Sequence, residues 1–425
     1  MLLAQQPTPF TREDFSYSPM LVFYEVTRAC DMVCKHCRAD AQKTCHPDEL
    51  NTTSARRLID QLLDFPKRPM LVFTGGDPIK RADIFELIDH SVSRGITTAL
   101  TPSPTPLVTS QTLVRLKAAG LHRLAVSLDG ADAFTHDHWR RTPGSFARTL
   151  EILTDARALG LSVQVNTTVS RANLHQLGRI AELLEPYGIA MWSVFFLVPT
   201  GRAQAQQRLQ GPEVKAAFTE LYRQSAIRRF PIKTTEAPHY RRFVLQQETQ
   251  AKRAAPTGQA CACGGGGGHG HGESHAHEHA DTHEPGHTCC GRGDGSCRGQ
   301  SSAPATAATL SMRPRLPGTN DGRGVMFVSH VGEIFPSGFL PIECGRFPRD
   351  NLKHVYQNAT LFKQLRDPGA IGGKCGVCEF RCVCGGSRAR AFALTGDPLA
   401  PEPDCSYTPA GYGGMTNTQG TDDQT

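Results

Sequence analysis

Short apolar runs alternate with amphipathic stretches along the first half of the chain. The apolar runs have the length of buried strands, and the stretches between them place apolar residues at helical spacing, as at Leu58, Leu62 and Leu63. Strands and helices in alternation predict a parallel α/β barrel or part of one. The predicted strands are 21–26, 69–74, 96–101, 123–130, 161–169 and 191–198, and the predicted helices are 53–65, 84–94, 113–119, 146–159 and 174–187.

The segments outside this core, which spans residues 21–205, differ from it in composition. Residues 1–20 predict an irregular lead-in, and residues 206–254, rich in Arg and Gln, predict a helical extension. Residues 255–320 are rich in Gly, His and Cys and offer almost nothing to bury, which predicts a disordered insertion. This insertion is either a tolerated spacer or a loose binding site for Zn, Ni or Cu. Residues 413–425 predict a disordered tail.

Three cysteines follow the first predicted strand as CxxxCxxC, at Cys30, Cys34 and Cys37. Their thiolates can hold three irons of a 4Fe–4S cube and leave the fourth iron open for a small molecule. His36 and Cys45 are the candidates for a fourth ligand. His36 lies between Lys35 and Cys37 and is expected to point away from the site, and Cys45 lies in a polar loop. The pattern therefore favours an open iron over a closed zinc site.

Polar residues and glycines follow two of the predicted strands. Gly75, Gly76 and Asp77 end the second strand, where glycine lets the backbone approach a ligand and an acid can accept hydrogen bonds from an ammonium group. Ser127 and Asp129 end the fourth strand and share one of its faces. The alternatives are a tight turn at the glycines and capping of the next helix by Asp129.

A second cysteine constellation lies near the carboxyl end of the chain. Residues 321–412 predict two strands joined at 331–332 and a helix over 351–365, followed by a CxxC pair and further cysteines. Four of them can hold a second 4Fe–4S cube, and structural zinc is the alternative. The predicted ligands are Cys375, Cys378, Cys384 and Cys405, with Cys382 and Cys344 as possible replacements.

Composition and charge narrow the class of partner. The net charge is +6, but the basic residues stand in pairs such as Arg140–Arg141, which favours anionic small substrates over nucleic acid. No apolar run is long enough to span a membrane, and the first residues do not form a secretion signal, so a cytoplasmic protein is expected. In a reducing compartment, the clustered members of the 15 cysteines are expected to be metal ligands.

The CxxxCxxC motif, with His36 before the last cysteine, resembles the motif of radical S-adenosylmethionine (SAM) enzymes. In that family the open iron binds the amino and carboxylate groups of SAM, which is cleaved to a 5′-deoxyadenosyl radical. The resemblance extends to the segment 75–77, which is similar to a GGE motif, to the SxDG element at 127–130, and to a loop at 136–146. It implies a partial (β/α)6, TIM-like barrel in which Gly75, Gly76, Asp77, Ser127, Asp129 and Asn166 bind SAM. The turn at Gly201–Arg202 is expected near the adenine.

The carboxyl-terminal segment resembles the small Fe–S extension called SPASM, and most strongly that of the haem and tetrapyrrole biosynthesis branch. The phrases GEIFPSGFLP, CGVCEF and CGGSRARA carry this likeness, whereas Ser337 stands where other members have a cysteine. The implied protein is a radical SAM oxidoreductase with two 4Fe–4S clusters and SAM as cofactors. The auxiliary cluster is expected to accept an electron from the substrate or to anchor it.

The substrate stays open between two classes. A tetrapyrrole with propionates, undergoing oxidative decarboxylation, is favoured, and Arg140–Arg141 can meet its carboxylates. The alternative is a ribosomally made peptide that the enzyme matures. A reductant such as flavodoxin or ferredoxin is expected as partner, and no nucleic acid. The alternative of another class is a non-catalytic Fe–S or zinc protein.

Overall fold

The computed structural model describes residues 9–254, 318–410 and 412. The chain divides into two units, Met1–Glu248 with Pro314–Thr425, and Thr249–Arg313. Of the second unit, only residues 249–254 are described, as the end of a helix. The predicted insertion therefore lies almost entirely outside the described residues, as does the predicted tail.

The first unit is built on one sheet of ten strands in the order β10-β9-β8-β1-β2-β3-β4-β5-β6-β7. Neighbouring strands from β8 to β7 in this order run parallel, and only the pairs β8–β9 and β9–β10 are antiparallel. The strands are β1 Leu21–Thr27, β2 Met70–Gly75, β3 Thr98–Leu100, β4 Arg123–Ser127, β5 Val163–Val169, β6 Met191–Phe196, β7 Ile232–Thr235, β8 Val325–Val328, β9 Glu333–Phe335 and β10 Gly345–Arg346.

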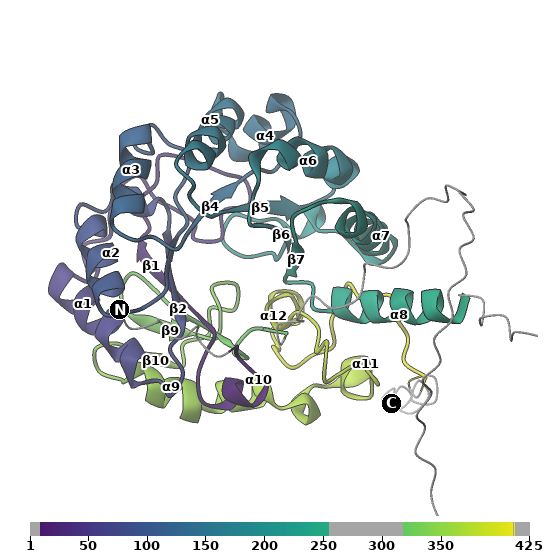
Figure 1. The fold of residues 1–425 in the computed structure, drawn as a ribbon. Coiled ribbons are helices and arrows are strands. Elements are labelled where there is room, and N and C mark those ends of the chain that lie inside the picture. Colours follow the sequence, from purple (N-terminus) through teal and green to yellow (C-terminus); the bar gives the residue numbers. More distant parts are fainter. Residues whose placement is uncertain (1–8, 255–317, 411, 413–425) are drawn as a thin grey trace, which may run out of the picture. The chain divides into compact units, whose positions relative to one another are not determined.

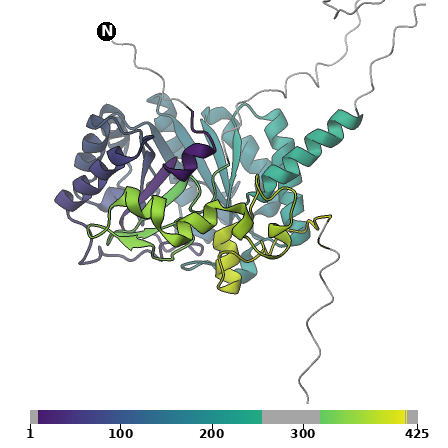
Figure 2. The same ribbon diagram turned by 90° about the horizontal axis from the view of Figure 1, so that it is seen from below.

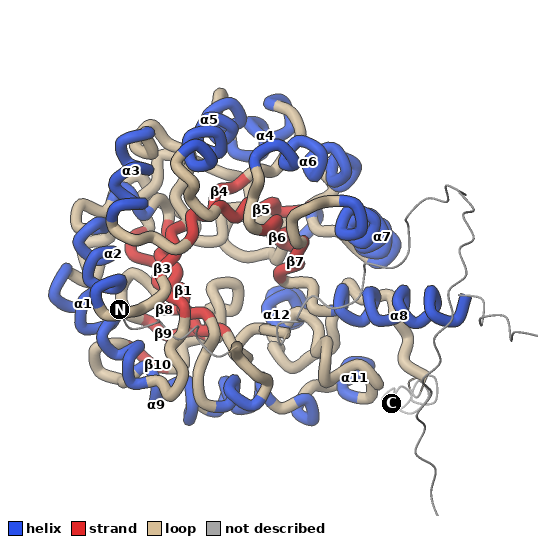
Figure 3. Tube along the Cα trace, viewed as in Figure 1, coloured by secondary structure: helices blue, strands red, loops and turns tan. Residues whose placement is uncertain are grey.

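Helices cover the outer face of the curved sheet, and the strands form the inner layer (Figures 1 and 3). The helices of the described residues are α1 Thr52–Asp60, α2 Ile84–Ser93, α3 Ser110–Ala118, α4 Ala133–Arg140, α5 Ser145–Ala158, α6 Leu177–Leu184, α7 Gly211–Ile227, α8 His239–Ala254, α9 Leu352–Asn358, α10 Thr360–Arg366, α11 Gly373–Gly376 and α12 Arg388–Thr395. This arrangement confirms the predicted α/β class and partial barrel.

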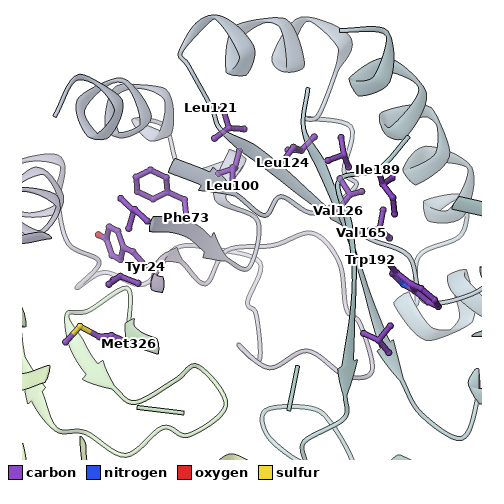
Figure 4. Packing of buried hydrophobic residues seen from close by; sticks show 14 of the residues in the cluster. Tyr24, Phe73, Leu100, Leu121, Leu124, Val126, Val165, Ile189, Trp192 and Met326 are labelled. Atoms are coloured by element: carbon purple, nitrogen blue, oxygen red, sulfur yellow. The ribbon is translucent and has the colours of Figure 1, made fainter. Parts of the chain in front are cut away.

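The core lies between the sheet and the helices. Side chains alternate between the two faces of a strand, and paired residues of neighbouring strands share a face. The strand register therefore collects the apolar side chains of several strands on the face that the helices cover. Figure 4 shows the outward-facing set packed together. The labelled members are Tyr24, Phe73, Leu100, Leu121, Leu124, Val126, Val165, Ile189, Trp192 and Met326, all buried. The other face of the strands therefore remains for polar side chains and a ligand.

Three local predictions were wrong. The segment 206–254 contains a strand, β7, which pairs in parallel with β6 and extends the barrel beyond six units. The segment 136–146, predicted as a loop, begins inside α4, whose N-cap Asp132 accepts a hydrogen bond from the Thr135 backbone N–H. The helix predicted over 351–365 breaks at Ala359, where the backbone becomes extended between α9 and α10.

The carboxyl-terminal segment joins both sides of the parallel sheet. Its strand β8 pairs with β1, as the register of Phe23 with Phe327 shows. Near the other edge, Arg390 of α12 donates to the backbone oxygen of Glu236, just beyond β7, at 2.7 Å. Figure 2, seen from below, shows this segment in green and yellow along one side of the sheet. Residues 21–205 and 321–412 thus share one fold.

Candidate functional site

The loop that follows β1 brings three thiols together, as predicted. Cys30 and Cys34 are buried and form one small apolar cluster with Met32 and Ala41, against which the half-buried Cys37 packs. Backbone N–H groups already point at two of the sulfurs, since Met32 donates to Cys30 and Ala41 to Cys37, each at 3.4 Å. Such contacts favour the thiolate form and are usual around iron–sulfur clusters. The three thiols therefore share one small buried cluster at the end of β1.

Neither candidate for a fourth ligand joins these thiols. The His36 ring stacks on Trp139 at 5.3 Å, and its Nε2 lies 3.5 Å from Oδ2 of Asp129. Burial lowers the pKa of His36 to about 4, so the ring is neutral at pH 7. Cys45 is exposed to solvent. Within the described chain, neither His36 nor Cys45 is placed as a fourth ligand, and the open iron stays a prediction.

Two glycines at the end of β2 hold the backbone that leads into the cysteine loop. The N–H of Gly76 donates to the Thr27 oxygen at 2.8 Å, and the N–H of Asp77 donates to the Ala29 oxygen at 2.7 Å. A Cβ atom at Gly75 would lie 2.3 Å from the Thr27 oxygen, and one at Gly76 would lie 2.5 Å from the Ala29 oxygen. The glycines are therefore needed for close approach of two backbones.

The Asp77 carboxylate organises the loop after β3. Its Oδ1 accepts from the backbone N–H groups of Ile79 at 3.2 Å and Ser103 at 3.3 Å. Its Oδ2 accepts from the Thr105 hydroxyl at 2.7 Å, and burial raises the pKa of Asp77. The Ser103 hydroxyl in turn lies 3.5 Å from the Cys30 sulfur. The side chain thus supports the wall beside the first cysteine, and its oxygens are already occupied within the chain.

A turn after β6 supports the cysteine loop from the other side. Arg202 donates to the backbone oxygens of Cys34 at 3.0 Å and Ala41 at 2.9 Å. Its own N–H donates to the Cys37 oxygen at 3.0 Å, and a Cβ at Gly201 would lie 2.3 Å from that oxygen. The sequence placed this turn near the adenine and missed its role as a support. A glycine followed by an arginine in a turn gave no signal for this long-range contact.

Asp129 and Arg140 form a buried ion pair beside Cys34. The Nε of Arg140 lies 2.7 Å from Oδ2 of Asp129, and the Thr168 N–H donates to Oδ1 at 2.7 Å. Burial alone would raise the pKa of Asp129, but the charge of Arg140, the neighbouring histidines and the Thr168 hydrogen bond together outweigh burial, and the pKa lies below its ordinary value. Another Arg140 nitrogen, Nη1, lies 3.7 Å from the Cys34 sulfur.

This ion pair corrects two expectations. Asp129 does not cap the next helix, because Asp132 is the N-cap of α4. Arg140 is not available to substrate carboxylates, since its guanidinium is buried against Asp129 and Cys34. An arginine at this position instead places a positive charge next to a cluster thiolate.

Ser127 and Asn166 lie side by side on the inner face. They are register partners, Ser127 at the carboxyl end of β4 and Asn166 in the middle of β5, and Oδ1 of Asn166 accepts from the Gln164 side chain at 2.7 Å. Both are half-buried. The structure therefore brings these two predicted residues to one place, on the face that the apolar core leaves open.

The four predicted auxiliary cysteines line one cavity. Two of their sulfurs accept backbone hydrogen bonds, Cys375 from Glu402 at 3.3 Å and Cys384 from Gly386 at 3.4 Å. The cavity-lining cysteines are Cys375, Cys378, Cys384 and Cys405. The alternatives lie elsewhere: Cys382 is exposed and outside this lining, and Cys344 lines a separate cavity beside α9.

His239 also lines the auxiliary cavity and was missed by the sequence analysis. It is 1% exposed, and neither ring nitrogen has a hydrogen-bond partner within the described residues. Burial lowers its pKa to about 3, so the ring is neutral. A buried imidazole without partners is costly, and a group bound in the cavity can relieve that cost.

Comparison with known proteins agrees with this geometry. The model of the radical SAM superfamily matches residues 24–184. A Nitratidesulfovibrio vulgaris protein named AdoMet-dependent heme synthase is 34% identical over 403 residues, which cover 94% of this chain and 96% of that protein. A Methanosarcina barkeri protein of the same name is 34% identical over 392 residues, 92% of this chain and 97% of that protein.

A solved structure shows the same fold. Streptococcus suis SuiB bound to S-adenosylmethionine is similar with a TM-score of 0.60 at 14% identity, over 92% of this chain and 78% of SuiB. The chain belongs to the radical SAM superfamily, whose members use a 4Fe–4S cluster and SAM, and it is an oxidoreductase of that class. Within the class it resembles the haem-biosynthesis branch, whose AdoMet-dependent heme synthases match almost its whole length. A non-catalytic metal protein is thereby set aside.

No helix in the described part of the chain is both long enough and apolar enough to cross a membrane.

Replacing Gly76 with alanine should damage the first cluster site. The new Cβ would lie 2.5 Å from the Ala29 oxygen and 2.6 Å from the Arg28 oxygen, so the backbone before Cys30 must move. We expect a loss of about 2 kcal/mol or more in the free energy of unfolding, measured by denaturant titration, together with lower iron retention. In the control Gly369→Ala, the nearest atom is a side-chain oxygen of Asp367 at 3.1 Å, and little change is expected. Equal iron retention in both variants would contradict this explanation of the glycine.

Proposed function

We propose that this chain cleaves SAM at a 4Fe–4S cluster held by Cys30, Cys34 and Cys37 and uses the resulting radical to oxidise a propionate-bearing tetrapyrrole. The observation that carries the proposal is the gathering of three thiols without a fourth ligand, at the carboxyl end of β1. The names of the relatives that match nearly the whole chain support a haem-type substrate. When bound, the cluster would supply the electron that cleaves SAM to methionine and a 5′-deoxyadenosyl radical.

The chain's own residues provide position and electrostatics. Gly75, Gly76 and Asp77 shape the wall beside Cys30, and Ser127 and Asn166 offer polar groups to the SAM molecule from the inner face. Asp129 contributes through the buried Arg140, whose charge lies against the Cys34 sulfur. These groups are fixed before the cofactor binds, which lowers the cost of organising the site.

The reaction removes one hydrogen atom from a propionate side chain. Bound SAM would supply the radical that accepts this hydrogen from the carbon next to the ring and so forms 5′-deoxyadenosine. The C–C bond to the carboxylate then breaks, which releases carbon dioxide and one electron and leaves a vinyl group. An electron acceptor is therefore required for each turnover.

The auxiliary cavity supports a second cluster as that acceptor. Four cysteine sulfurs line it, which is the full ligand set of a 4Fe–4S cube, and His239 adds an unpaired imidazole. When bound, this cluster would supply a place for the substrate's electron. We place the radical SAM domain at residues 21–205 and the auxiliary domain at residues 321–412 in this scheme.

The wider setting follows from the chemistry. A low-potential reductant such as flavodoxin or ferredoxin would load the first cluster, and such chemistry belongs in a reducing cytoplasm. A peptide substrate remains the second prediction, and incubation of the protein with candidate porphyrins and peptides under reducing, oxygen-free conditions would separate the two by the mass change of each.

Replacing Cys30 with alanine should abolish SAM cleavage. The variant retains only two of the three thiolates, so the cube loses a corner ligand. We expect 5′-deoxyadenosine formation with dithionite to fall by at least about a thousandfold, to the background of the assay. The matched control is Cys45→Ala, which removes an exposed thiol and should leave the product unchanged. If Cys30→Ala formed the product at the wild-type rate, the proposed function would be wrong.

The auxiliary ligands can be tested by iron counting. The reconstituted wild type should hold about eight irons and Cys384→Ala about four, because the second cube loses a cavity-lining ligand. Cys382→Ala should retain the wild-type count, since that thiol is exposed and lies outside the cavity lining. Iron loss in Cys382→Ala with full retention in Cys384→Ala would reverse the assignment, and bound zinc in place of iron would refute the second cube.

A further inference from the structure

Four basic side chains gather near the inner face of the sheet without any acidic partner. Residues two apart on a strand share a face, so Arg123 lies on the same face of β4 as Ala125 and Ser127. This is the inner face, because Ser127 pairs there with Asn166. Lys233 of β7 reaches the same face, because it pairs with Ser193, the register partner of Asn166. Two further members come from α8 and from the residues before β8. This group, the cationic cluster, consists of Arg123, Lys233, Arg241 and Arg323.

The contacts of the cationic cluster are with backbone oxygens, not with carboxylates. Arg241 donates to the oxygens of Thr319 and, at 2.9 Å, Val383, and Arg323 donates to the Cys382 oxygen at 3.5 Å. The Nε atoms of Arg123 and Arg323 are buried and have no hydrogen-bond partner within the described residues. The whole Arg323 residue is only 7% exposed. Across the described ranges, none of the four forms an ion pair.

Lys233 and Arg323 lie in surroundings that disfavour a positive charge. Burial lowers the pKa of Lys233 to about 8, and the charges of Arg241 and Arg123 add to the effect. Burial likewise lowers the pKa of Arg323 to about 10, with further contributions from Arg241 and the exposed Arg12. Holding like charges together in a partly dry site costs free energy, which an anionic ligand would recover.

Several other buried arginines of the chain are paired with carboxylates, whereas Arg388 donates only to backbone oxygens. Arg140 is paired with Asp129, Arg390 with Asp404, and Arg38 with Glu25, at 2.7, 3.1 and 2.8 Å. Buried charges are normally compensated in this way. The cationic cluster lacks such compensation within the described residues, and two of its members contact backbone oxygens of the segment at 382–383.

We propose that the cationic cluster binds carboxylate groups of the substrate, which must carry at least two of them. This inference rests on the proposed function and deepens it, because it assigns the anion-binding residues that Arg140 cannot supply. Guanidinium groups bind carboxylates with two parallel hydrogen bonds, and lysine adds a mobile charge. A porphyrin with several propionates presents such groups around the edge of a flat ring. Propionates on one edge of the ring can then meet Arg123 and Lys233, while those on the opposite edge meet Arg241 and Arg323.

The test is a binding titration on the anaerobically reconstituted holoprotein. The probe is iron coproporphyrin, which has four propionates, followed by its Soret absorbance. The double variant Arg123→Gln/Lys233→Gln should bind it about tenfold more weakly or worse, with a shallower dependence of affinity on salt. The conservative variant Lys233→Arg should retain the affinity. The control Arg229→Gln removes a charge from a side chain that is 97% exposed and should change nothing.

The outcomes separate this inference from the proposed function. Should the double variant fail to hold iron, the single variant Arg323→Gln gives the same test from the other side of the cluster. If the double variant and Arg323→Gln both bind iron coproporphyrin with wild-type affinity, the cationic cluster is not the carboxylate site. The proposed function is not affected by that result. A wild type that forms 5′-deoxyadenosine but binds no porphyrin overturns the tetrapyrrole substrate and this inference together, while radical SAM chemistry survives.

Discussion

The close approach of two backbones beside the cysteine loop is the constraint on which the site depends. The end of β2 lies so near the residues after β1 that only glycine fits at positions 75 and 76. Arg202 holds the same loop from the opposite side through backbone oxygens of Cys34 and Ala41. Three sulfurs in eight residues are a flexible set on their own. The glycines and the arginine hold the backbone of this loop in one conformation.

Charge is distributed in two ways around this site. Near the first cysteines, the buried Asp129 is paired with Arg140, which also lies 3.7 Å from the Cys34 sulfur. Such pairing lets a negatively charged cluster sit in a dry environment. Farther along the inner face, the cationic cluster has no such partner within the described residues. The charge of Arg140 is compensated within the chain, whereas we propose that substrate carboxylates compensate the charges of the cationic cluster.

The sequence predicted what local patterns can encode. Alternating apolar and amphipathic runs gave the barrel, and spacing gave both cysteine sets, because ligands of one cluster lie close along the chain. The sequence analysis failed where the environment of a residue depends on partners far away along the chain. The strand β7 was hidden in an Arg-rich, helical-looking segment and is fixed only by pairing with β6. Arg140 was expected to meet substrate carboxylates, and its burial against Asp129 depends on how α4 packs. His239 and Arg202 gave no pattern at all.

The central claim is that one iron of the first cluster is free to bind SAM. Electron–nuclear double resonance on the reduced cluster, with SAM labelled with 15N in its amino group and 17O in its carboxylate, tests it directly. Hyperfine coupling to both labels is expected in the wild-type protein, because Cys30, Cys34 and Cys37 ligate only three irons. A reduced cluster that shows no coupling to either label with SAM in excess would mean that the fourth corner is closed, and the account would be wrong.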